Sequence, residues 1–135
     1  MIFVDTGAWF ALLVADDPAH GAVRTLVDST RERLITTDYV FDEVLTLLKV
    51  RRSTELALAA GQLLWSGEVT ALEYLTRRDV GAAWELFQKY RDKDWSFTDS
   101  SSFVFMKRRK LTRALALDHH FDQFPGVERL QLDWV

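Results

Sequence analysis

The chain has 135 residues and a net charge of -3, from 17 basic and 20 acidic side chains, and 48% of its residues are hydrophobic. This length and hydrophobic content allow one substantial core, and we predict a single domain over residues 1–135. The negative charge argues against binding to nucleic acid through bulk positive potential. The absence of Cys excludes a disulfide framework, a thiol nucleophile and a thiolate metal site.

No segment is predicted to cross a membrane or to direct export. The longest uninterrupted apolar stretch is eight residues, from Ala8 to Ala15, whereas a membrane-spanning helix needs about 20. The N-terminus has no Lys or Arg before Arg24 and carries an acid at Asp5, unlike a secretory signal. We therefore expect a cytoplasmic protein without membrane contact.

Short β-rich runs alternate with longer amphipathic stretches, which is typical of repeated βα units. The predicted strands are 2–4, 34–36, 69–75, 114–117 and 128–132. The predicted helices are 7–15, 19–31, 39–51, 54–65, 80–90 and 99–110. Capping or proline signals mark helix starts at Asp17-Pro18, Asp38, Ser53, Arg78-Asp79 and Thr98-Asp99. We predict an α/β fold with a central, mostly parallel sheet of about five strands flanked by helices.

Two acids follow predicted strands directly. Asp5 comes after "IFV" and Asp118 comes after "ALAL". In an open parallel sheet, ligands bind beyond the carboxyl ends of the strands, where the strand order reverses. Both carboxylates would project into one crevice if the two strands are neighbours, although each acid alone is equally explained as a helix cap.

Two further acids lie on predicted helices. Asp99 shares a helical face with Phe103 and Met106, an unusual place for a solvated acid, although the helix dipole favours Asp in a first turn. Glu43 lies on the flank of an apolar helix face, whereas Asp42 points away from that face. If these two acids join Asp5 and Asp118, the cluster needs a cation to relieve its repulsion, and oxygen ligands suit Mg²⁺. Such a cluster can support metal-assisted hydrolysis of a phosphodiester.

Four segments together resemble a known family. They are "VDTGAWFALL", "DEVLTLLKVR", "DWSFTDSSSFVFMKRRK" and "ALALDHHFDQFPGVERL", in this order and at similar separations. The chain resembles PIN-domain nucleases over nearly its whole length, and in particular the VapC-like toxins of toxin-antitoxin pairs. One departure is Gly7, where many relatives carry a second small hydroxyl after the Asp-Thr pair.

The resemblance implies a metal-dependent endoribonuclease that hydrolyses phosphodiester bonds of tRNA or another structured or single-stranded RNA. Its catalytic and metal-binding residues would be Asp5, Glu43, Asp99 and Asp118, with Mg²⁺ or Mn²⁺ as the cofactor. Thr6 and Thr98 match positions of supporting hydroxyls, although both are equally explained as capping residues. The implied partners are an RNA substrate, a cognate antitoxin protein and a second copy of the chain in a homodimer.

Several other residues receive structural interpretations. Adjacent side chains at a strand end diverge, so we expect His119 at the surface and His120 in a structural role, rather than a zinc site. The basic run 107–110 ends a helix, where positive charge favours the dipole, although it could contact RNA phosphates. The Trp side chains at positions 9, 65, 84, 95 and 134 are predicted to be core or interface anchors, and by family resemblance Trp9 and Trp65 are the candidate partner contacts.

Three alternatives differ from a ribonuclease. A phosphoacceptor receiver domain needs paired acids after the first strand and a Lys after a late strand, but the chain has "VDTG" and "ALDHH" there. A haloacid-dehalogenase-type phosphatase needs an Asp two residues after Asp5, where Gly7 stands. The third alternative is a catalytically inactive PIN fold that only binds RNA or protein.

Overall fold

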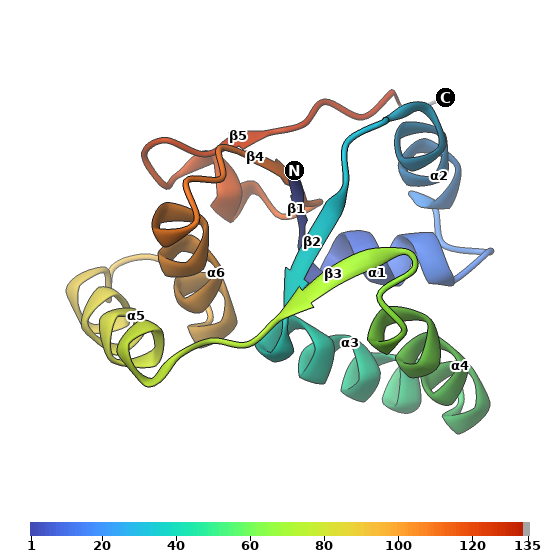
Figure 1. The fold of residues 1–135 in the computed structure, drawn as a ribbon, viewed down its shortest axis with the longest axis horizontal. Coiled ribbons are helices and arrows are strands. Elements are labelled where there is room, and N and C mark those ends of the chain that lie inside the picture. The colour runs from blue at the N-terminus through green and yellow to red at the C-terminus, as the bar shows by residue number, and fades with distance from the viewer. Residues whose placement is uncertain (134–135) are drawn as a thin grey trace.

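The strands form where short apolar runs can be buried on both faces of a sheet. The computed structural model describes residues 1–133 and contains β1 (Ile2–Val4), β2 (Leu34–Thr37), β3 (Thr70–Glu73), β4 (Arg113–Leu115) and β5 (Glu128–Arg129). Within these residues, the five strands form one parallel sheet in the order β3-β2-β1-β4-β5 (Figure 1). The predicted α/β fold with a parallel sheet is therefore confirmed.

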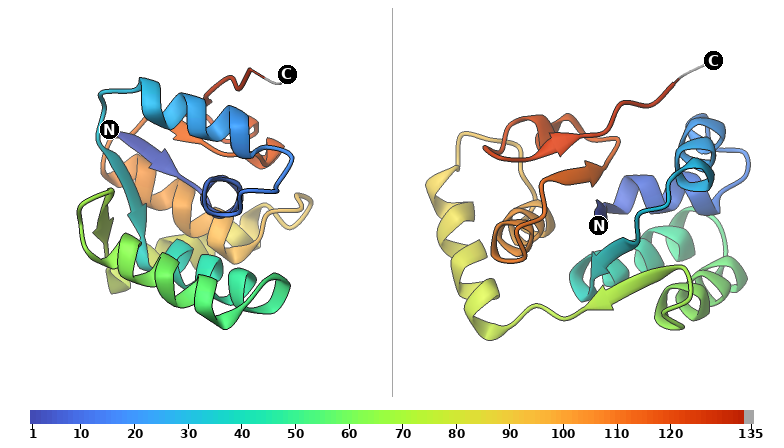
Figure 2. Two further views of the ribbon diagram at one scale, coloured as in Figure 1. Left: turned by 90° about the vertical axis from the view of Figure 1, so that its right-hand side faces the viewer. Right: turned by 45° about the horizontal axis from the view of Figure 1, so that its top comes forward.

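Helices cover both faces of this sheet. They are α1 (Thr6–Leu13), α2 (His20–Ser29), α3 (Asp38–Arg51), α4 (Thr54–Trp65), α5 (Arg77–Lys89) and α6 (Phe97–Arg108). The first four gather on one side of the sheet, and α5 and α6 lie on the other (Figures 1 and 2). The chain moves outward through the sheet from β1 to β2 and β3, and then crosses back to β4 on the other side of β1. Because parallel crossovers are right-handed, the helices of the outward crossovers and those of the return crossover lie on opposite faces of the sheet. Over residues 1–133, every helix is too short or too polar to cross a bilayer.

Several helices begin earlier than predicted, and the capping residues differ accordingly. Thr37, Thr76 and Ser96 are the N-caps of α3, α5 and α6, and their side chains accept hydrogen bonds from the backbone. The predicted caps Asp79 and Asp99 are instead the third residues of their helices. Ser53 caps α4 as predicted. A hydroxyl three residues before an acid is the capping-box pattern, which explains both shifts.

The core lies between the sheet and its helices, and it is rich in aromatic side chains. Phe3 of β1 packs against Phe105 of α6 and Phe121, with ring centroids 6.1 and 6.2 Å apart. Trp9 and Trp95 are buried core anchors, so the expectation of Trp9 as a partner contact is wrong, whereas Trp65 and Trp84 are 59% and 54% exposed. Trp134 lies outside the described residues.

The strand order reverses at β1, which lies between β2 and β4. Val4 is in register with Leu115, and the next backbone N–H, that of Asp5, donates to the Leu115 carbonyl at 3.0 Å. The chain after β1 and the chain after β4 therefore leave the sheet side by side. This is the topological switch point at which α/β proteins bind ligands.

Candidate active site

Asp5 lies at the carboxyl end of the central strand, with only 5% of its surface exposed. It is the N-cap residue of α1, but its side chain makes no capping hydrogen bond. One carboxylate oxygen, Oδ1, is buried and has no hydrogen-bond partner in residues 1–133. Asp5 is therefore not explained as a helix cap, and a buried carboxylate without a partner requires compensation from elsewhere.

Asp99 is held at the start of α6 by its backbone. Asp99 Oδ2 accepts a hydrogen bond from Ser96 N at 3.0 Å, and Ser96 Oγ accepts one from Asp99 N at the same distance. This capping box fixes the side chain on the buried side of the first turn, where Asp99 is 7% exposed. The pattern "SFTD" carries this signal in the sequence, whereas the predicted helix start lay at Thr98-Asp99.

Asp118 and Asp99 meet at one imidazole ring. His120 Nδ1 lies 2.9 Å from Asp99 Oδ2 and 3.1 Å from Asp118 Oδ2. Because both partners are carboxylates and can only accept, Nδ1 carries the proton. Asp118 Oδ1 also accepts a hydrogen bond from His120 N at 2.9 Å, which caps the 3₁₀ helix η1 (His119–Asp122). The predicted structural role of His120 thus has a concrete form, because His120 holds two of the four acids together.

The electrostatics of Asp5 place all four acids in one cluster. The pKa of Asp5 is raised from 3.8 to about 8, first by burial and then by the nearby charges of Asp99, Glu43 and Asp118, while a backbone hydrogen bond from Thr6 opposes the shift. Burial also raises the pKa of Asp99, although hydrogen bonds from Ser96 and His120 oppose this effect. Repulsion of this kind disfavours the charged form of an acid unless a cation is added.

Glu43 reaches this cluster from α3, which starts at the carboxyl end of β2. The Glu43 side chain is half-buried on the flank of the helix, whereas Asp42 is exposed. The structure therefore brings together the four acids that were singled out in the sequence. Their role as metal ligands stays a prediction.

The two candidate hydroxyls lie beside these acids but differ in environment. Thr6 is buried, and its Oγ1 has no hydrogen-bond partner in residues 1–133. Thr98 is half-buried in the first turn of α6, and its carbonyl accepts a hydrogen bond from Ser101 Oγ at 2.7 Å. Neither side chain caps a helix, since α1 has no side-chain cap bond and Ser96 caps α6.

One prediction at this site was wrong. The side chains of His119 and His120 were expected to diverge, but their ring centroids lie 4.8 Å apart. Asp118, His119 and His120 each offer a ligand atom within 4.8 Å of the others. The strand has already ended at Leu115, and the tight 3₁₀ helix does not alternate its side chains as a strand does. His119 is 70% exposed, in agreement with its predicted surface position.

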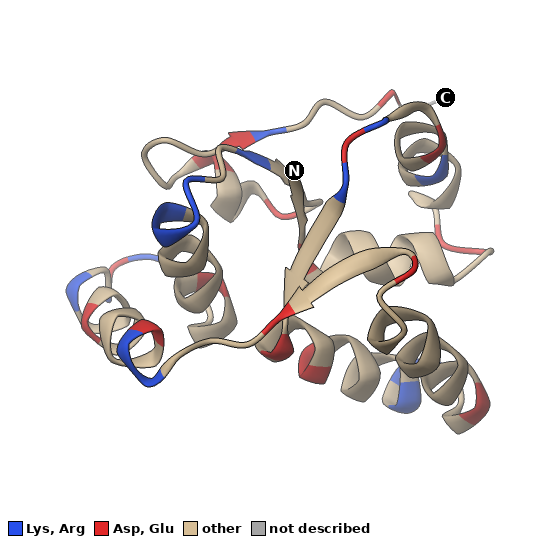
Figure 3. Ribbon diagram, viewed as in Figure 1, with Lys and Arg blue, Asp and Glu red and all other residues tan. Residues whose placement is uncertain are grey.

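Two of the basic residues near the end of α6 form ion pairs within the protein. Arg108 binds Asp79 through two hydrogen bonds of 2.8 and 2.9 Å, and Arg109 binds Glu73 at 2.9 Å. Lys107 and Lys110 are exposed. Figure 3 shows these basic residues at one end of α6, while α1, which follows Asp5, carries no charged residue.

The donor set fits a divalent cation. The charges of Asp99, Glu43 and Asp118 all act on the buried Asp5, and Asp5 Oδ1 has no protein partner in residues 1–133. Carboxylate oxygens are the ligands that Mg²⁺ and Mn²⁺ prefer. A cation among them would remove the repulsion that raises the pKa of Asp5.

The amino-acid sequence matches a known protein family over most of its length. Residues 2–127 match the PIN domain family. The chain belongs to the PIN-domain family. The match excludes the receiver domain and the haloacid-dehalogenase-type phosphatase as descriptions of the chain.

Curated relatives lie among the VapC ribonucleases of the same family. The chain is 34% identical over 128 residues to the 23S rRNA-specific endonuclease VapC20 of Mycobacterium tuberculosis, covering 95% of this chain and 97% of the relative. It is 28% identical over 121 residues to Ribonuclease VapC26 of M. tuberculosis, covering 89% of each chain. These relatives confirm the predicted class of activity, a ribonuclease of the VapC toxin type.

Solved structures agree with these relatives. The crystal structure of M. tuberculosis VapC20, described as a Sarcin-Ricin loop cleaving toxin, superposes with a TM-score of 0.86 at 32% identity, covering 91% of this chain and 94% of the other. FitAcB from Neisseria gonorrhoeae shares the fold alone, with a TM-score of 0.67 at 16% identity and 97% coverage of each chain. The PIN fold is therefore established by both sequence and shape.

Proposed function

We propose that this protein is a divalent-metal-dependent endoribonuclease whose acids Asp5, Glu43, Asp99 and Asp118 hold Mg²⁺ or Mn²⁺. The buried Asp5 carboxylate carries this proposal, because it lies at the switch point of the sheet among three other acids and its pKa is raised to about 8. A buried acid without a partner lowers the stability of the fold, so a purely structural role does not explain Asp5. A cation offsets this cost.

The chain's own residues prepare the site in three ways. The β1–β4 pairing sets Asp5 beside the segment that carries Asp118. The capping box holds Asp99 in one orientation, and His120 Nδ1 ties the Asp99 and Asp118 carboxylates to each other. Such fixed ligands need little reorganisation during the reaction. The bound metal would activate water for attack on phosphorus and stabilise the charge that develops on the phosphodiester.

The substrate that we propose is an unpaired loop of a structured RNA, and a 23S rRNA loop is the first to test. The name of the 34% identical relative, a 23S rRNA-specific endonuclease, supports this choice over tRNA. Since ribosomes are cytoplasmic, we place the activity in the cytoplasm. We further propose a cognate antitoxin that blocks the activity and a homodimeric toxin, both on the basis of the VapC resemblance.

The test is cleavage of purified ribosomes by wild type and by Asp5→Asn, with Mg²⁺, with Mn²⁺ and with chelator. The expected result is metal-dependent cutting of 23S rRNA that is lost in the variant, with a total tRNA pool in a parallel reaction to identify the RNA class. Metal-independent cutting, or cutting that the variant retains, would contradict the proposal. Absence of cutting together with tight RNA binding would favour the catalytically inactive binding module.

A further inference from the structure

A row of four aromatic rings leads away from the acidic cluster. Tyr39 of α3 contacts Phe97 of α6, Phe97 contacts Phe87 of α5, and Phe87 contacts Trp84. The successive ring centroids are 6.1, 5.7 and 6.3 Å apart, and the outermost pair is stacked with an interplanar angle of 26°. We call these four side chains the aromatic row.

The inner end of the aromatic row lies at the edge of the candidate active site. Phe97 is the first residue of α6, two residues before Asp99 and beside its cap Ser96. Tyr39 lies in the first turn of α3, one helical turn before Glu43 and on the same side of the helix. The contact between Tyr39 and Phe97 therefore joins the two helix ends that carry Asp99 and Glu43.

The outer end of the row lies in solvent on α5. This helix runs antiparallel to α6, since Asp79 near its start pairs with Arg108 at the end of α6, while Phe87 near its end meets Phe97. Trp84 is 54% exposed and Phe87 is 37% exposed. Two large aromatic side chains are thus presented to solvent beside the site, although burial of either would stabilise the fold.

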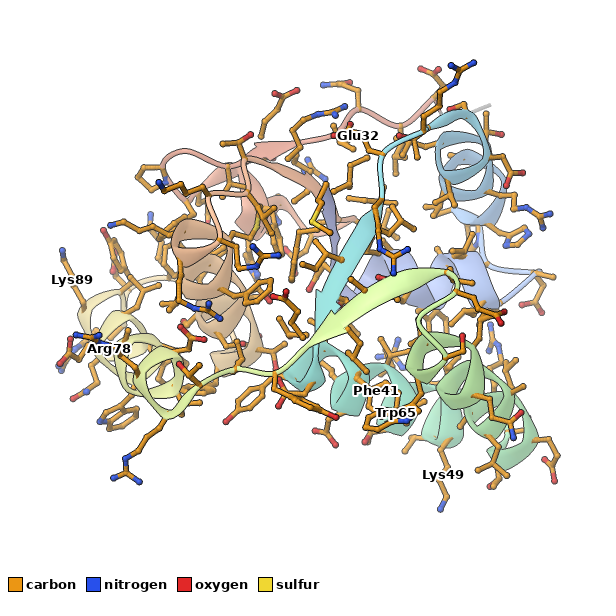
Figure 4. The ribbon with its side chains drawn as sticks, in the orientation of Figure 1. Glu32, Phe41, Lys49, Trp65, Arg78 and Lys89 are labelled. Atoms are coloured by element: carbon orange, nitrogen blue, oxygen red, sulfur yellow. The ribbon has the colours of Figure 1, made fainter. Side chains whose placement is uncertain are left out.

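The charges around the outer rings favour a polyanion. Arg77 lies seven residues before Trp84, which is about two helical turns and the same side of α5. Arg77, Arg78 and Lys89 are exposed, whereas Glu85 is the one exposed acid of this helix. Figure 4 shows the Arg78 and Lys89 side chains projecting from α5 away from the rest of the molecule.

We propose that the aromatic row is a base-stacking surface that holds unpaired nucleotides of the RNA next to the acidic cluster, with Arg77 contacting a phosphate further along the strand. The inference rests on the proposed function for the identity of the ligand. Aromatic faces accept any base, and bases in a duplex are unavailable to them because they are already stacked. The row therefore selects unpaired RNA without reading its sequence.

The experiment measures binding and catalysis separately. Binding of a labelled RNA stem–loop, and of a fully paired hairpin of the same length, is followed by fluorescence anisotropy in chelator, where metal-dependent cleavage does not occur. The variants are Trp84→Leu, Phe87→Leu and the conservative Trp84→Phe. Trp65→Leu is the matched control, because Trp65 is similarly exposed at 59% but lies at the end of α4 beside Phe41, apart from α5 (Figure 4).

Trp84→Leu and Phe87→Leu should each weaken binding of the stem–loop about tenfold, while binding of the paired hairpin stays constant. Trp84→Phe should recover most of the affinity, and Trp65→Leu should match wild type. In cleavage assays, the two leucine variants should raise KM with little change in kcat.

Equal affinity in all variants, or equal binding of paired and unpaired RNA by wild type, would overturn the inference. So would a loss of binding that accompanies dissociation of a dimer in light scattering, because the row would then be an interface between copies. Failure of the proposed function is a separate result: the wild type would cut no RNA with metal, while the binding assay would still decide the role of the row.

Discussion

Asp79 and Asp99 occupy the same local structure but opposite environments. Each is the third residue of a helix, each completes a capping box with a hydroxyl residue, and each is buried, at 3% and 7% exposure. Asp79 faces the Arg108 guanidinium, whose hydrogen bonds, with those from Thr76, hold the pKa of Asp79 below its usual value although burial opposes them. Asp99 faces other acids together with His120, and burial raises its pKa although hydrogen bonds from Ser96 and His120 oppose this effect.

The difference teaches that a local motif does not decide whether a buried acid is structural or functional. A paired carboxylate is neutralised inside the protein and needs nothing further. A carboxylate surrounded by acids leaves a net negative charge for an external cation. The capping box serves both acids by fixing their orientation, and the partner supplied by the tertiary structure sets the chemistry.

The largest expected difference between the two acids is in catalysis. Asp99→Asn should lower the rate of RNA cleavage at least about 100-fold, because it removes a charge from the metal site while the amide oxygen preserves the cap. Asp79→Asn should retain the rate at a temperature where it is folded, because Asp79 lies at the far end of α5. The measurement is the initial rate of 23S rRNA cleavage at saturating metal. Comparable loss in both variants would contradict a functional distinction between them.

The proximity of the four acids was easier to predict from the sequence than their surroundings were. Asp5 and Asp118 could be found because a strand-end acid in an α/β pattern has a defined place, and Asp99 and Glu43 could be found from helical periodicity. The pairing of Arg108 with Asp79 could not be found, because the two are 29 residues apart and meet only when α5 packs against α6. The basic run 107–110 was predicted to end a helix, but its structural ion pairs could not be predicted.

The aromatic row shows the same limit. Tyr39, Trp84 and Phe87 fall in predicted helices, Phe97 lies just before the predicted helix 99–110, and Trp84 is predicted to be a core or interface anchor. The row exists because three helices bring their ends together, which periodicity within one helix does not report. The end of β4 was also predicted too late, at residue 117 instead of Leu115. The apolar run 114–117 continues beyond the last residue that pairs with β1, and pairing with another strand is not visible in the sequence.

The metal-free protein should lose stability as the pH rises from about 4 to about 8. Over this range the unfolded chain has released the Asp5 proton, whereas the folded protein, in which the pKa is about 8, retains it. Unfolding then releases a proton, so a higher pH favours unfolding, with an expected loss of about 5 kcal/mol. The Asp79 pair has the opposite sign, because its lowered pKa contributes stability that is lost as the pH falls below about 4.

Urea denaturation in chelator across this pH range measures both effects. Asp5→Asn should flatten the loss between pH 4 and 8, and its gain over wild type should be greatest near pH 8. A wild-type stability that rises between pH 5 and 8 would show that Asp5 is ionised in the folded, metal-free protein.

Removing the partner of Asp79 should destabilise the fold, whereas removing a charge from the acidic cluster should not. Arg108→Met should lower the free energy of unfolding by about 2 kcal/mol at pH 7, because it leaves the buried Asp79 carboxylate unpaired. The effect is smaller than for a fully buried ion pair, because the Arg108 side chain is 42% exposed. Asp99→Asn in chelator should be at least as stable as wild type, because it relieves repulsion. Chemical denaturation of both variants in one buffer tests the pair, and a destabilised Asp99→Asn would indicate that its bond to His120 outweighs the repulsion.

The smallest expected effect is protection by metal, and it distinguishes the two regions without a rate measurement. Mg²⁺ or Mn²⁺ at about ten times its dissociation constant should stabilise wild type by about 1.4 kcal/mol, because only the folded cluster binds the ion well. Arg108→Met should gain the same increment, since its altered region is separate from the acids. Asp5→Asn should gain little, because its cluster has lost both a ligand and the repulsion that the cation relieves. Thermal unfolding across a metal titration measures these increments, and equal protection of Asp5→Asn and wild type would place the bound ion away from the carboxyl end of β1.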